Sequence, residues 1–261
     1  MLALADQMKH PWRKYPNKVI VHYGDIRSTS LLAYKAASIQ LGCYTLTANV
    51  EPEIPDSIQT LQYYGDALVV CHPQDTQKWV DTEIPVIRES KPVQALTDLY
   101  TMVQELKFRG IELDQENRPT IKVTFLGYSR TVQPFVKLLD LFPNIEFFYT
   151  QKNEEVPQDT DVLYVCNRQG TDTYHISSTF LKSLKPTMIL MHPLPRTSEL
   201  SSDVDRNPRC VYFKQFRNGM YMRMAILDNV LSPTCSPSLW EYASMAWRVI
   251  LDRTWFRFYN A

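Results

Sequence analysis

The chain has 261 residues, of which 44% are hydrophobic and 21% are charged. These values are typical of a globular protein with a sizeable core, and they exclude a disordered or collagen-like chain. Twenty-eight basic residues balance twenty-eight acidic ones, so the net charge does not favour binding to nucleic acid or to an anionic membrane.

Five cysteines are spread along the chain without a CxxC spacing, namely Cys43, Cys71, Cys166, Cys210 and Cys235. An odd number of widely spaced cysteines predicts buried thiols in a reducing compartment rather than disulfides or metal ligands. No apolar run reaches the length of a membrane span, and the N-terminus lacks an apolar signal core. We therefore expect an intracellular protein without cofactor or metal, cytoplasmic by default, with an organelle matrix as the alternative if the chain works in an organellar complex.

Strand-like and helical segments alternate along the first part of the chain. Lys18 to Tyr23 is an apolar run that ends at Gly24, as a buried strand does. Ser28 to Leu41 has apolar residues at helical spacing, and Gly42 follows as a stop signal. Further short elements are predicted over 43–47, 54–64, 67–70, 75–80 and 84–87. This alternation predicts a parallel, doubly wound sheet.

A long helix over Pro92 to Lys107 and a polar break over 114–118 separate this series from a second one. The second series is predicted to contain a helix over 130–141 and strands over 121–126, 145–149, 161–165 and 188–191, and another long helix is predicted over 217–231. The chain is therefore predicted to form two parallel-sheet domains.

The last thirty residues concentrate aromatic side chains. Ser236-Pro237 is a typical helix start, and apolar residues cover more than one face of the helix that follows. Such a helix must pack either on its own domain or on another protein, and aromatic residues are favoured at interface cores. The interface candidates are Trp240, Trp247, Trp255 and Phe256.

A proline-rich motif follows the strand predicted over 188–191. In His192-Pro193-Leu194-Pro195-Arg196, two prolines fix φ and remove two backbone donors, which makes the loop rigid and presents its carbonyls outward. Loops at the carboxyl end of such a sheet are where small ligands bind. A plain turn between a strand and a helix is the alternative, which the Pro-x-Pro pattern alone does not exclude.

The motif continues in a longer run of residues. The run contains Glu199-Leu200, Val204-Asp205, Pro208-Arg209, Tyr212-Phe213, Gln215, Asn218-Gly219-Met220 and Arg223-Met224-Ala225. Together with the motif, it closely resembles the C-terminal signature of aspartate carbamoyltransferases. The resemblance implies an α/β fold with two doubly wound parallel-sheet domains of the aspartate/ornithine carbamoyltransferase type, plus a C-terminal helical extension. It implies a carbamoyl-phosphate-type domain over 1–107, completed by the helix 217–231, an aspartate-type domain over 118–216, and the extension over 232–261.

The resemblance also implies where a phosphate would bind. In the family, a Ser-Thr-Arg-Thr loop at a helix N-terminus cradles the phosphate. Here Arg27-Ser28-Thr29-Ser30 stands in its place, so Thr29 replaces the phosphate-binding arginine. A shift of two residues would restore Arg27 to that position but would set Asp25 against the phosphate. The hydroxyls of this loop are expected to cap the helix.

The other residues that the resemblance implies for contacts to carbamoyl phosphate are also replaced. The family's Arg-His-Pro reads Cys71-His72-Pro73, and a neutral thiol cannot make a charge-assisted hydrogen bond worth about 1.5–3 kcal/mol. The family's His-Pro-Thr-Gln reads Lys91-Pro92-Val93-Gln94, which keeps Gln94 and replaces the histidine by Lys91. The loop that a neighbouring subunit inserts into the site is shortened to 50–55, with two glutamates and no lysine.

The residues that the resemblance implies for binding aspartate match the family's motifs better. Arg130 stands where the family's Gly-Arg-Thr-Val places its arginine, and Asn167-Arg168-Gln169 replaces Arg-x-Gln, so that Gln169 is kept and Asn167 replaces an arginine. If binding is retained, the residues implied to contact substrate are Ser28, Ser30, Arg130, Gln169, Pro193 and Leu194.

Three arginines, the histidine and the lysine are thus absent from the positions that the family assigns to them. A loss of about 2 kcal/mol of transition-state binding at each would slow the reaction by many decades. The sequence therefore predicts no confident catalytic residue, and it leaves Thr29, Cys71, Lys91 and Gln94 as vestigial positions.

We interpret the chain as an aspartate carbamoyltransferase-like protein that has lost catalysis and serves as a structural or interaction subunit, contacting other subunits through its C-terminal helix. Two alternatives stay open. One is an active aspartate carbamoyltransferase of pyrimidine biosynthesis, which forms N-carbamoyl-L-aspartate with a rearranged site. The other is a related enzyme that uses another amine or anion. The shortened loop over 50–55 also places the family's homotrimer in doubt.

Overall fold

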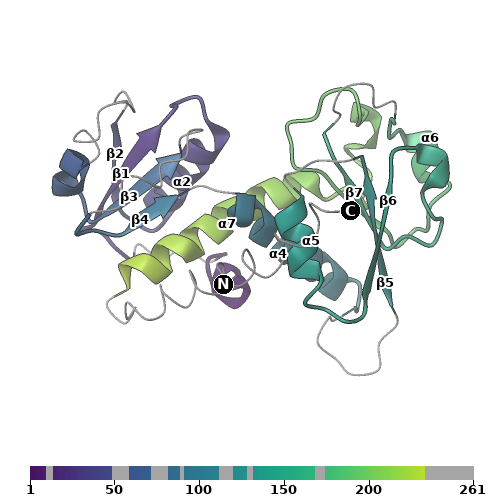
Figure 1. Cartoon of the computed structure of the whole chain (residues 1–261), viewed down its shortest axis with the longest axis horizontal. Helices are drawn as coiled ribbons and strands as arrows, with labels where there is room; N and C mark the ends of the chain where they lie inside the picture. The colour runs from purple at the N-terminus through teal and green to yellow at the C-terminus, as the bar shows by residue number, and fades with distance from the viewer. Residues whose placement is uncertain are drawn as a thin grey trace, which may run out of the picture. The chain divides into compact units, whose positions relative to one another are not determined.

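The computed structural model describes residues 1–9, 14–48, 59–71, 82–88, 91–111, 120–127, 132–167 and 174–232. These residues form two compact units, each built on a four-stranded parallel sheet (Figure 1). Unit 1 comprises the described residues of 3–89 and those from 220 on, and unit 2 comprises those of 90–219. The predicted fold class of two parallel sheets with flanking helices is confirmed.

The sheet of unit 1 has the strand order β2-β1-β3-β4. Its strands are β1 (Val19–Gly24), β2 (Tyr44–Ala48), β3 (Ala67–Cys71) and β4 (Val86–Arg88). The central strands β1 and β3 are buried on both faces, as expected for a parallel sheet covered by helices, whereas β2 at the edge is largely exposed. The register sets Gly24 beside Cys71, so both lie at the carboxyl end of the sheet.

The helical elements of unit 1 are α1 (Leu2–Gln7), α2 (Thr29–Gln40), η1 (Gln62–Tyr64) and the second part of α7 (Tyr212–Leu231). Ser28 starts α2 as its N-cap, because the Ser28 side chain accepts a hydrogen bond from the backbone N–H of Leu31. The Arg223 guanidinium of α7 lies 5.2 Å from the centre of the Tyr34 ring of α2. The buried face of α2 therefore contacts both α7, through Tyr34, and β1, where Ser38 Oγ lies 3.2 Å from His22 Nε2.

The sheet of unit 2 has the strand order β6-β5-β7-β8. Its strands are β5 (Ile121–Leu126), β6 (Ile145–Thr150), β7 (Val162–Val165) and β8 (Ile189–Met191). The helices of unit 2 are α4 (Lys91–Phe108), α5 (Gln133–Leu139), α6 (Ser178–Leu181), the short turns η2 (Asn153–Glu155) and η3 (Ser202–Val204), and the start of α7.

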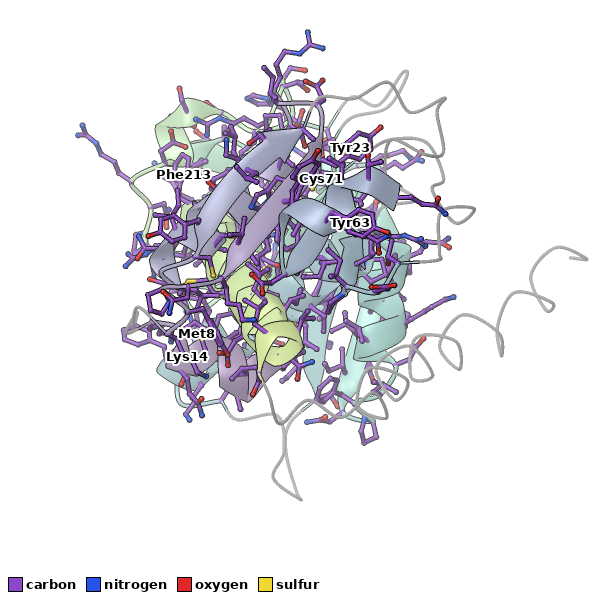
Figure 2. All side chains as sticks on the ribbon, turned by 90° about the vertical axis from the view of Figure 1, so that its left-hand side faces the viewer. Met8, Lys14, Tyr23, Tyr63, Cys71 and Phe213 are labelled. Carbon is purple, nitrogen blue, oxygen red and sulfur yellow. The ribbon has the colours of Figure 1, made fainter. Side chains whose placement is uncertain are left out.

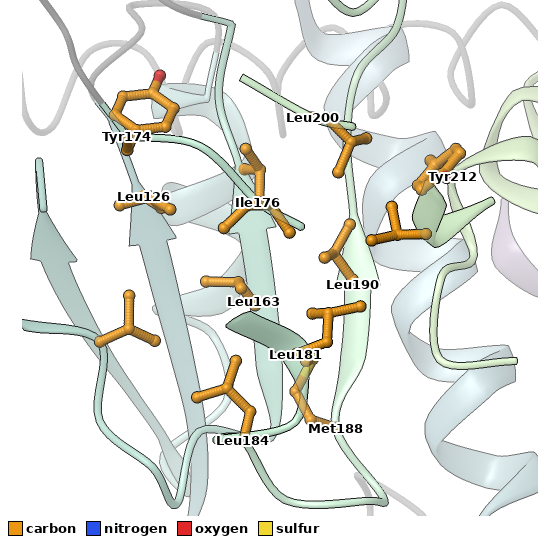
Figure 3. Close-up of a cluster of buried hydrophobic side chains, with 13 residues drawn as sticks. Leu126, Leu163, Tyr174, Ile176, Leu181, Leu184, Met188, Leu190, Leu200 and Tyr212 are labelled. Atoms are coloured by element: carbon orange, nitrogen blue, oxygen red, sulfur yellow. The ribbon is translucent and has the colours of Figure 1, made fainter. Parts of the chain in front are cut away.

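Figure 3 shows a core cluster of unit 2 in which Leu126, Leu163 and Leu190 of the strands pack with Tyr174, Ile176, Leu200 and Tyr212 from outside the sheet. The Tyr174 hydroxyl donates a 2.8 Å hydrogen bond to the Cys166 carbonyl at the end of β7. Gly127 has a φ of +87°, and a Cβ atom there would lie 2.1 Å from the Tyr174 hydroxyl oxygen. Only glycine therefore fits where the chain leaves β5.

The two compact units divide the chain slightly differently from the domains implied by the resemblance. Helix α4 groups with unit 2, whereas the implied boundary at 107 places it in the first domain. Functional domain boundaries stay a prediction. No described helix is both long and apolar enough to cross a membrane. Cys43, Cys71 and Cys166 are buried thiols, and Cys210 is half-buried.

Candidate functional site

The loop after β8 is built around the side chain of His192, which is fully buried in unit 2. The Leu194 N–H donates to His192 Nδ1 at 2.9 Å, so this nitrogen must be unprotonated. The ring proton therefore lies on Nε2, which is 2.8 Å from Glu199 Oε1 and donates to it. Burial lowers the pKa of His192 although Glu199 acts to raise it, and the imidazole is neutral. Because both ring nitrogens are bonded, His192 holds the loop and is not placed to act as a base.

Glu199 anchors the other end of this loop. It accepts hydrogen bonds from the Thr197 N–H at 3.0 Å and from the Thr197 hydroxyl at 2.5 Å, in addition to the one from His192. Burial acts to raise the pKa of Glu199, but the hydrogen bonds from Thr197 and His192 outweigh it and hold this pKa below its usual range. The buried carboxylate is therefore fully compensated.

A second network ties the loop to α4 and α7. Gln215 accepts from the His192 N–H at 3.0 Å and donates to Asp98 Oδ1 at 2.7 Å. Gln94 also donates to Asp98 Oδ1 at 2.7 Å, and the Tyr164 hydroxyl donates to Oδ2 at 2.8 Å. Burial raises the pKa of Asp98 to about 6, against the effect of these three hydrogen bonds. The amide group of Gln94, a predicted site residue, is thus directed into the interior.

Arg196, the last residue of the motif, is also engaged locally. Its guanidinium pairs with Asp205 through two nitrogens, one contact being Nη2 to Oδ2 at 2.8 Å. The Tyr212 hydroxyl donates to the same carboxylate, and the Tyr212 ring centre lies 5.8 Å from the guanidinium carbon. The ion pair fixes the far side of the loop and raises the pKa of Arg196.

The loop backbone between these anchors has an unusual conformation. Leu194 has a φ of +38° and is followed by a cis peptide bond to Pro195. The Asn167 side-chain amide, just beyond β7, donates a 2.7 Å hydrogen bond to the Pro195 carbonyl. The loop was predicted to be rigid with outward carbonyls; the structure shows that one of these carbonyls is bonded to Asn167.

In unit 1, the loop after β1 is arranged differently. Arg27 donates to Asp25 from its backbone N–H at 2.9 Å and from two guanidinium nitrogens at 3.1 Å each. The Arg27 side chain is 87% exposed. Its hydrogen bonds lower the pKa of Asp25, which is therefore ionised at neutral pH. Ser28 caps α2, as predicted, while Thr29 and Ser30 lie in the first turn of that helix.

Cys71 ends β3 beside the loop after β1, and Figure 2 shows it near Tyr23 at one end of the sheet. It is buried, and its backbone lies against Gly24, which has a φ of +145°. A Cβ atom at Gly24 would lie only 2.1 Å from the Cys71 carbonyl oxygen. The close approach of these two strand ends therefore requires glycine.

The sequence is similar to known proteins of one family. The family model for the aspartate/ornithine carbamoyltransferase Asp/Orn-binding domain matches residues 143–230. The aspartate carbamoyltransferase catalytic subunit of Vibrio campbellii is 29% identical over 241 residues, which cover 74% of this chain and 75% of that protein. That of Alkaliphilus oremlandii is 29% identical over 259 residues, covering 77% and 75%.

Solved structures agree with the relatives. Ligand-free aspartate transcarbamoylase of Trypanosoma cruzi superposes with a TM-score of 0.74 at 28% identity, covering 88% of this chain and 90% of that one. Its complex with carbamoyl aspartate and phosphate also gives 0.74 at 28% identity, covering 88% and 91%. In sequence and in fold, the chain is similar to proteins of the aspartate/ornithine carbamoyltransferase superfamily.

Several of the predicted site residues lie outside the described part of the structure. These are the side chains of Lys91, Arg130 and Gln169, the loop over 50–55, and the interface candidates Trp240, Trp247, Trp255 and Phe256. The structure places Ser28, Thr29 and Ser30 together at the start of α2 in unit 1. In unit 2, Asn167 bonds to the carbonyl of Pro195, which directly follows the predicted site residues Pro193 and Leu194. Among the described residues, no group of three or more His, Cys, Asp or Glu side chains is arranged to hold a metal ion.

Asp98, the buried acceptor of this network, was not predicted from the sequence. A signal was present, because Asp98 lies three residues after Ala95 and four before Met102, both buried on the same face of α4. A carboxylate within an apolar helical stripe needs buried partners, and here Gln94, Gln215 and Tyr164 supply them.

Proposed function

We propose that this protein keeps the carbamoyltransferase fold, has lost carbamoyl transfer, and serves as a structural or interaction subunit of a larger assembly. The observation that supports this most directly is the pairing of Arg27 with Asp25 in the loop where the family would bind phosphate. The position aligned with the phosphate-binding arginine holds Thr29 instead.

Charge is the physical reason why this loop is a poor phosphate site. Carbamoyl transfer requires a dianionic phosphate to be held by cations and N–H groups while charge develops on the carbonyl oxygen. Arg27 and the ionised Asp25 form a neutral pair, so an approaching phosphate gains little attraction and meets a carboxylate. The buried thiol of Cys71 adds no positive charge at the neighbouring strand end.

The aspartate side supports the same proposal at Asn167. The resemblance implies an arginine here that would hold a substrate carboxylate. The Asn167 amide carries no charge, and it donates its hydrogen bond to the Pro195 carbonyl within the protein. The residue thus stabilises the loop rather than offering a cation to a ligand.

An active aspartate carbamoyltransferase with a rearranged site is the second candidate. The relatives that carry the name of catalytic subunits favour it, as do the sequence matches at Gln94, Arg130 and Gln169. In that case Arg27 would have to leave Asp25 to bind phosphate, and Lys91 would take the place of the histidine. A third candidate is a related enzyme that uses another amine or anion.

The decisive experiment measures carbamoyl aspartate formed by the purified full chain from carbamoyl phosphate and L-aspartate. We expect no turnover above the uncatalysed background, with the Vibrio campbellii catalytic subunit as the positive control. Turnover well above background would overturn the proposal and establish the second candidate.

Ligand binding separates the remaining possibilities. N-phosphonacetyl-L-aspartate, which is bound in one Trypanosoma cruzi structure, would raise the melting temperature of a protein with an intact anion site. We expect no shift. A shift without turnover would instead point to a retained anion site and to the third candidate.

The interaction role is supported by the aromatic C-terminal sequence with Trp240, Trp247 and Trp255. Deletion of residues 237–261 is expected to release the protein from the assembly with which it co-purifies. Retention of the truncated chain in that assembly would contradict this part of the proposal.

A further inference from the structure

Asp98 of α4 lies at the centre of a cluster of four side chains in unit 2 and is 1% exposed. Its Oδ1 accepts hydrogen bonds from Gln94 Nε2 and Gln215 Nε2, both at 2.7 Å, and its Oδ2 accepts one from the Tyr164 hydroxyl at 2.8 Å. An ionised carboxylate has no proton to donate, so this arrangement belongs to the charged form. When Asp98 binds a proton, one of these three neighbours must become an acceptor if the new proton is to be bonded.

Gln215 is held in its orientation from its other end. The His192 backbone N–H donates to Gln215 Oε1 at 3.0 Å, and a backbone N–H cannot accept. Reversing the Gln215 amide would set two N–H groups against each other in the interior, because Gln215 is only 2% exposed. A buried donor without an acceptor is costly. Gln215 therefore remains a donor to Asp98 in both protonation states.

Tyr164 of β7 is also confined to its present role. It is 1% exposed, and the Asp98 carboxylate is the acceptor that the described residues supply to its hydroxyl. Accepting the proton of Asp98 would leave the Tyr164 hydroxyl proton unbonded. Burial and the charge of Asp98 raise the pKa of Tyr164 well above its usual value, so this proton is not lost either.

Gln94, in the first turn of α4, is the neighbour that can change its role. It is half-buried, and its Oε1 accepts no hydrogen bond from the described residues. This oxygen is not among the buried polar atoms that lack a partner, so it reaches the surface of unit 2. The two ends of a glutamine amide have nearly the same size and shape, so a turn by 180° needs no additional space.

We propose that Asp98 and Gln94 form a proton-operated switch that sets which group unit 2 presents at this surface. Asp98 takes a proton from water on Oδ1, and the Gln94 amide turns so that its Oε1 accepts that proton in a hydrogen bond. The bond from Gln94 Nε2 to Asp98 is broken, and Nε2 turns outward. Oδ1 continues to accept from Gln215, and Oδ2 continues to accept from Tyr164. The outward group thus changes from an acceptor to a donor, and loss of the proton reverses the change.

The surroundings of Asp98 place this switch near neutral pH. Burial raises the pKa of Asp98 from 3.8 to about 6, so both states are populated under ordinary conditions. Tyr164 stays protonated, and His192, which lies behind Gln215, is neutral. Helix α5 contributes the apolar ring of Phe135, 5.5 Å from the Tyr164 ring. Asp98 is therefore the member of this cluster that changes its charge. The switch lies within unit 2 and does not depend on whether the protein is catalytic.

The test follows side-chain amide resonances of the isotopically labelled full chain by NMR as the pH is lowered from about 8 to about 5. In the charged form, the Nε2 protons of Gln94 and Gln215 point at the same oxygen and should give a nuclear Overhauser cross-peak. We expect this cross-peak to be lost with a midpoint near pH 6. The backbone N–H of His192 should keep its resonance, because Gln215 does not turn. Gln94→Met removes the Gln94 signals and thereby assigns them.

Asp98→Asn is the matched control, because it keeps the size of the side chain but has no titrating group. Its Gln94 signals should not change over the same pH range. Circular dichroism checks that each protein is folded at both ends of the titration. If Asp98→Asn fails to fold, the titration of the wild-type chain decides by itself. Persistence of the cross-peak at the acid end would overturn the proposal. A change of the His192 N–H in its place would also overturn it, since Gln215 and not Gln94 would then be the group that turns.

Discussion

The loops that leave the carboxyl ends of the two sheets differ in how their polar groups are used. In unit 2, the loop after β8 buries His192 and Glu199 and pairs them with each other and with neighbouring donors. In unit 1, the loop after β1 is exposed, and its cation is paired with an acid two residues away.

This difference shows that a polar residue can be retained for two reasons, namely folding or ligand binding. A buried pair must stay complete, because removing one member leaves the other unsatisfied in the interior. An exposed arginine that binds a ligand contributes little to folding and can be replaced without destabilising the protein. The family motif in unit 2 is thus maintained by the fold itself, and it is compatible with the proposed loss of catalysis.

The largest effect is expected for Glu199→Ala. The substitution leaves the buried Nε2–H of His192 without an acceptor in the interior, and it also removes the acceptor of the Thr197 hydroxyl nearer the surface. It should lower the free energy of unfolding by roughly 3–5 kcal/mol, measured by urea denaturation. A loss below about 1 kcal/mol would show that the network of unit 2 is not needed for folding.

Acid should destabilise unit 1 through His22 of β1. His22 is fully buried, and its Nδ1 has no hydrogen-bond partner in the described structure. Burial, helped by Lys35, lowers its pKa from 6.5 to about 4. The neutral form is favoured on folding, so its stabilisation is complete above pH 6.5 and is lost as the pH falls towards 4. Wild type should lose roughly 3 kcal/mol relative to His22→Gln between pH 7 and pH 4. Parallel pH profiles of the two proteins would contradict this.

Unit 2 should respond to pH in the opposite direction through Asp98. Burial raises its pKa from 3.8 to about 6, so the folded protein binds the proton more tightly than the unfolded chain does. Its contribution is present below pH 3.8 and is lost as the pH rises through 6. The stability of wild type relative to Asp98→Asn should therefore fall by roughly 3 kcal/mol between pH 4 and pH 7. A constant difference across this range would show that Asp98 does not titrate there.

The smallest effect is expected for Asp25→Ala in unit 1. The Asp25–Arg27 pair is exposed and screened by solvent, so its removal should leave the urea midpoint of unfolding almost unchanged. The same urea denaturation, run beside Glu199→Ala, makes the comparison direct. Equal losses in the two variants would remove the distinction between the two loops.

Much of the fold could be predicted, because the spacing of hydrophobic residues within a short stretch of sequence distinguishes helices from strands. The strand predicted over 18–23 is observed as Val19–Gly24, and the helix predicted over 92–107 is observed as Lys91–Phe108. The loss of catalysis, the C-terminal contact and the domain boundaries stay predictions.

The candidate site could be predicted only in part, because its contacts join residues distant in sequence. Gln215 was recognised as part of the motif, but its bond to Asp98 spans 117 residues and depends on packing. The pairing of Arg27 with Asp25 is close in sequence, yet it depends on which rotamer the exposed arginine adopts.

His192 also gives the protein a spectroscopic reporter. Its Nε2 proton is buried and bonded to Glu199, so it should exchange slowly with water and give a distinct imidazole N–H resonance in proton NMR. Its nitrogen shifts should identify the neutral tautomer with the proton on Nε2. This single resonance would report whether unit 2 is folded in any variant, truncation or assembly, whatever the state of unit 1.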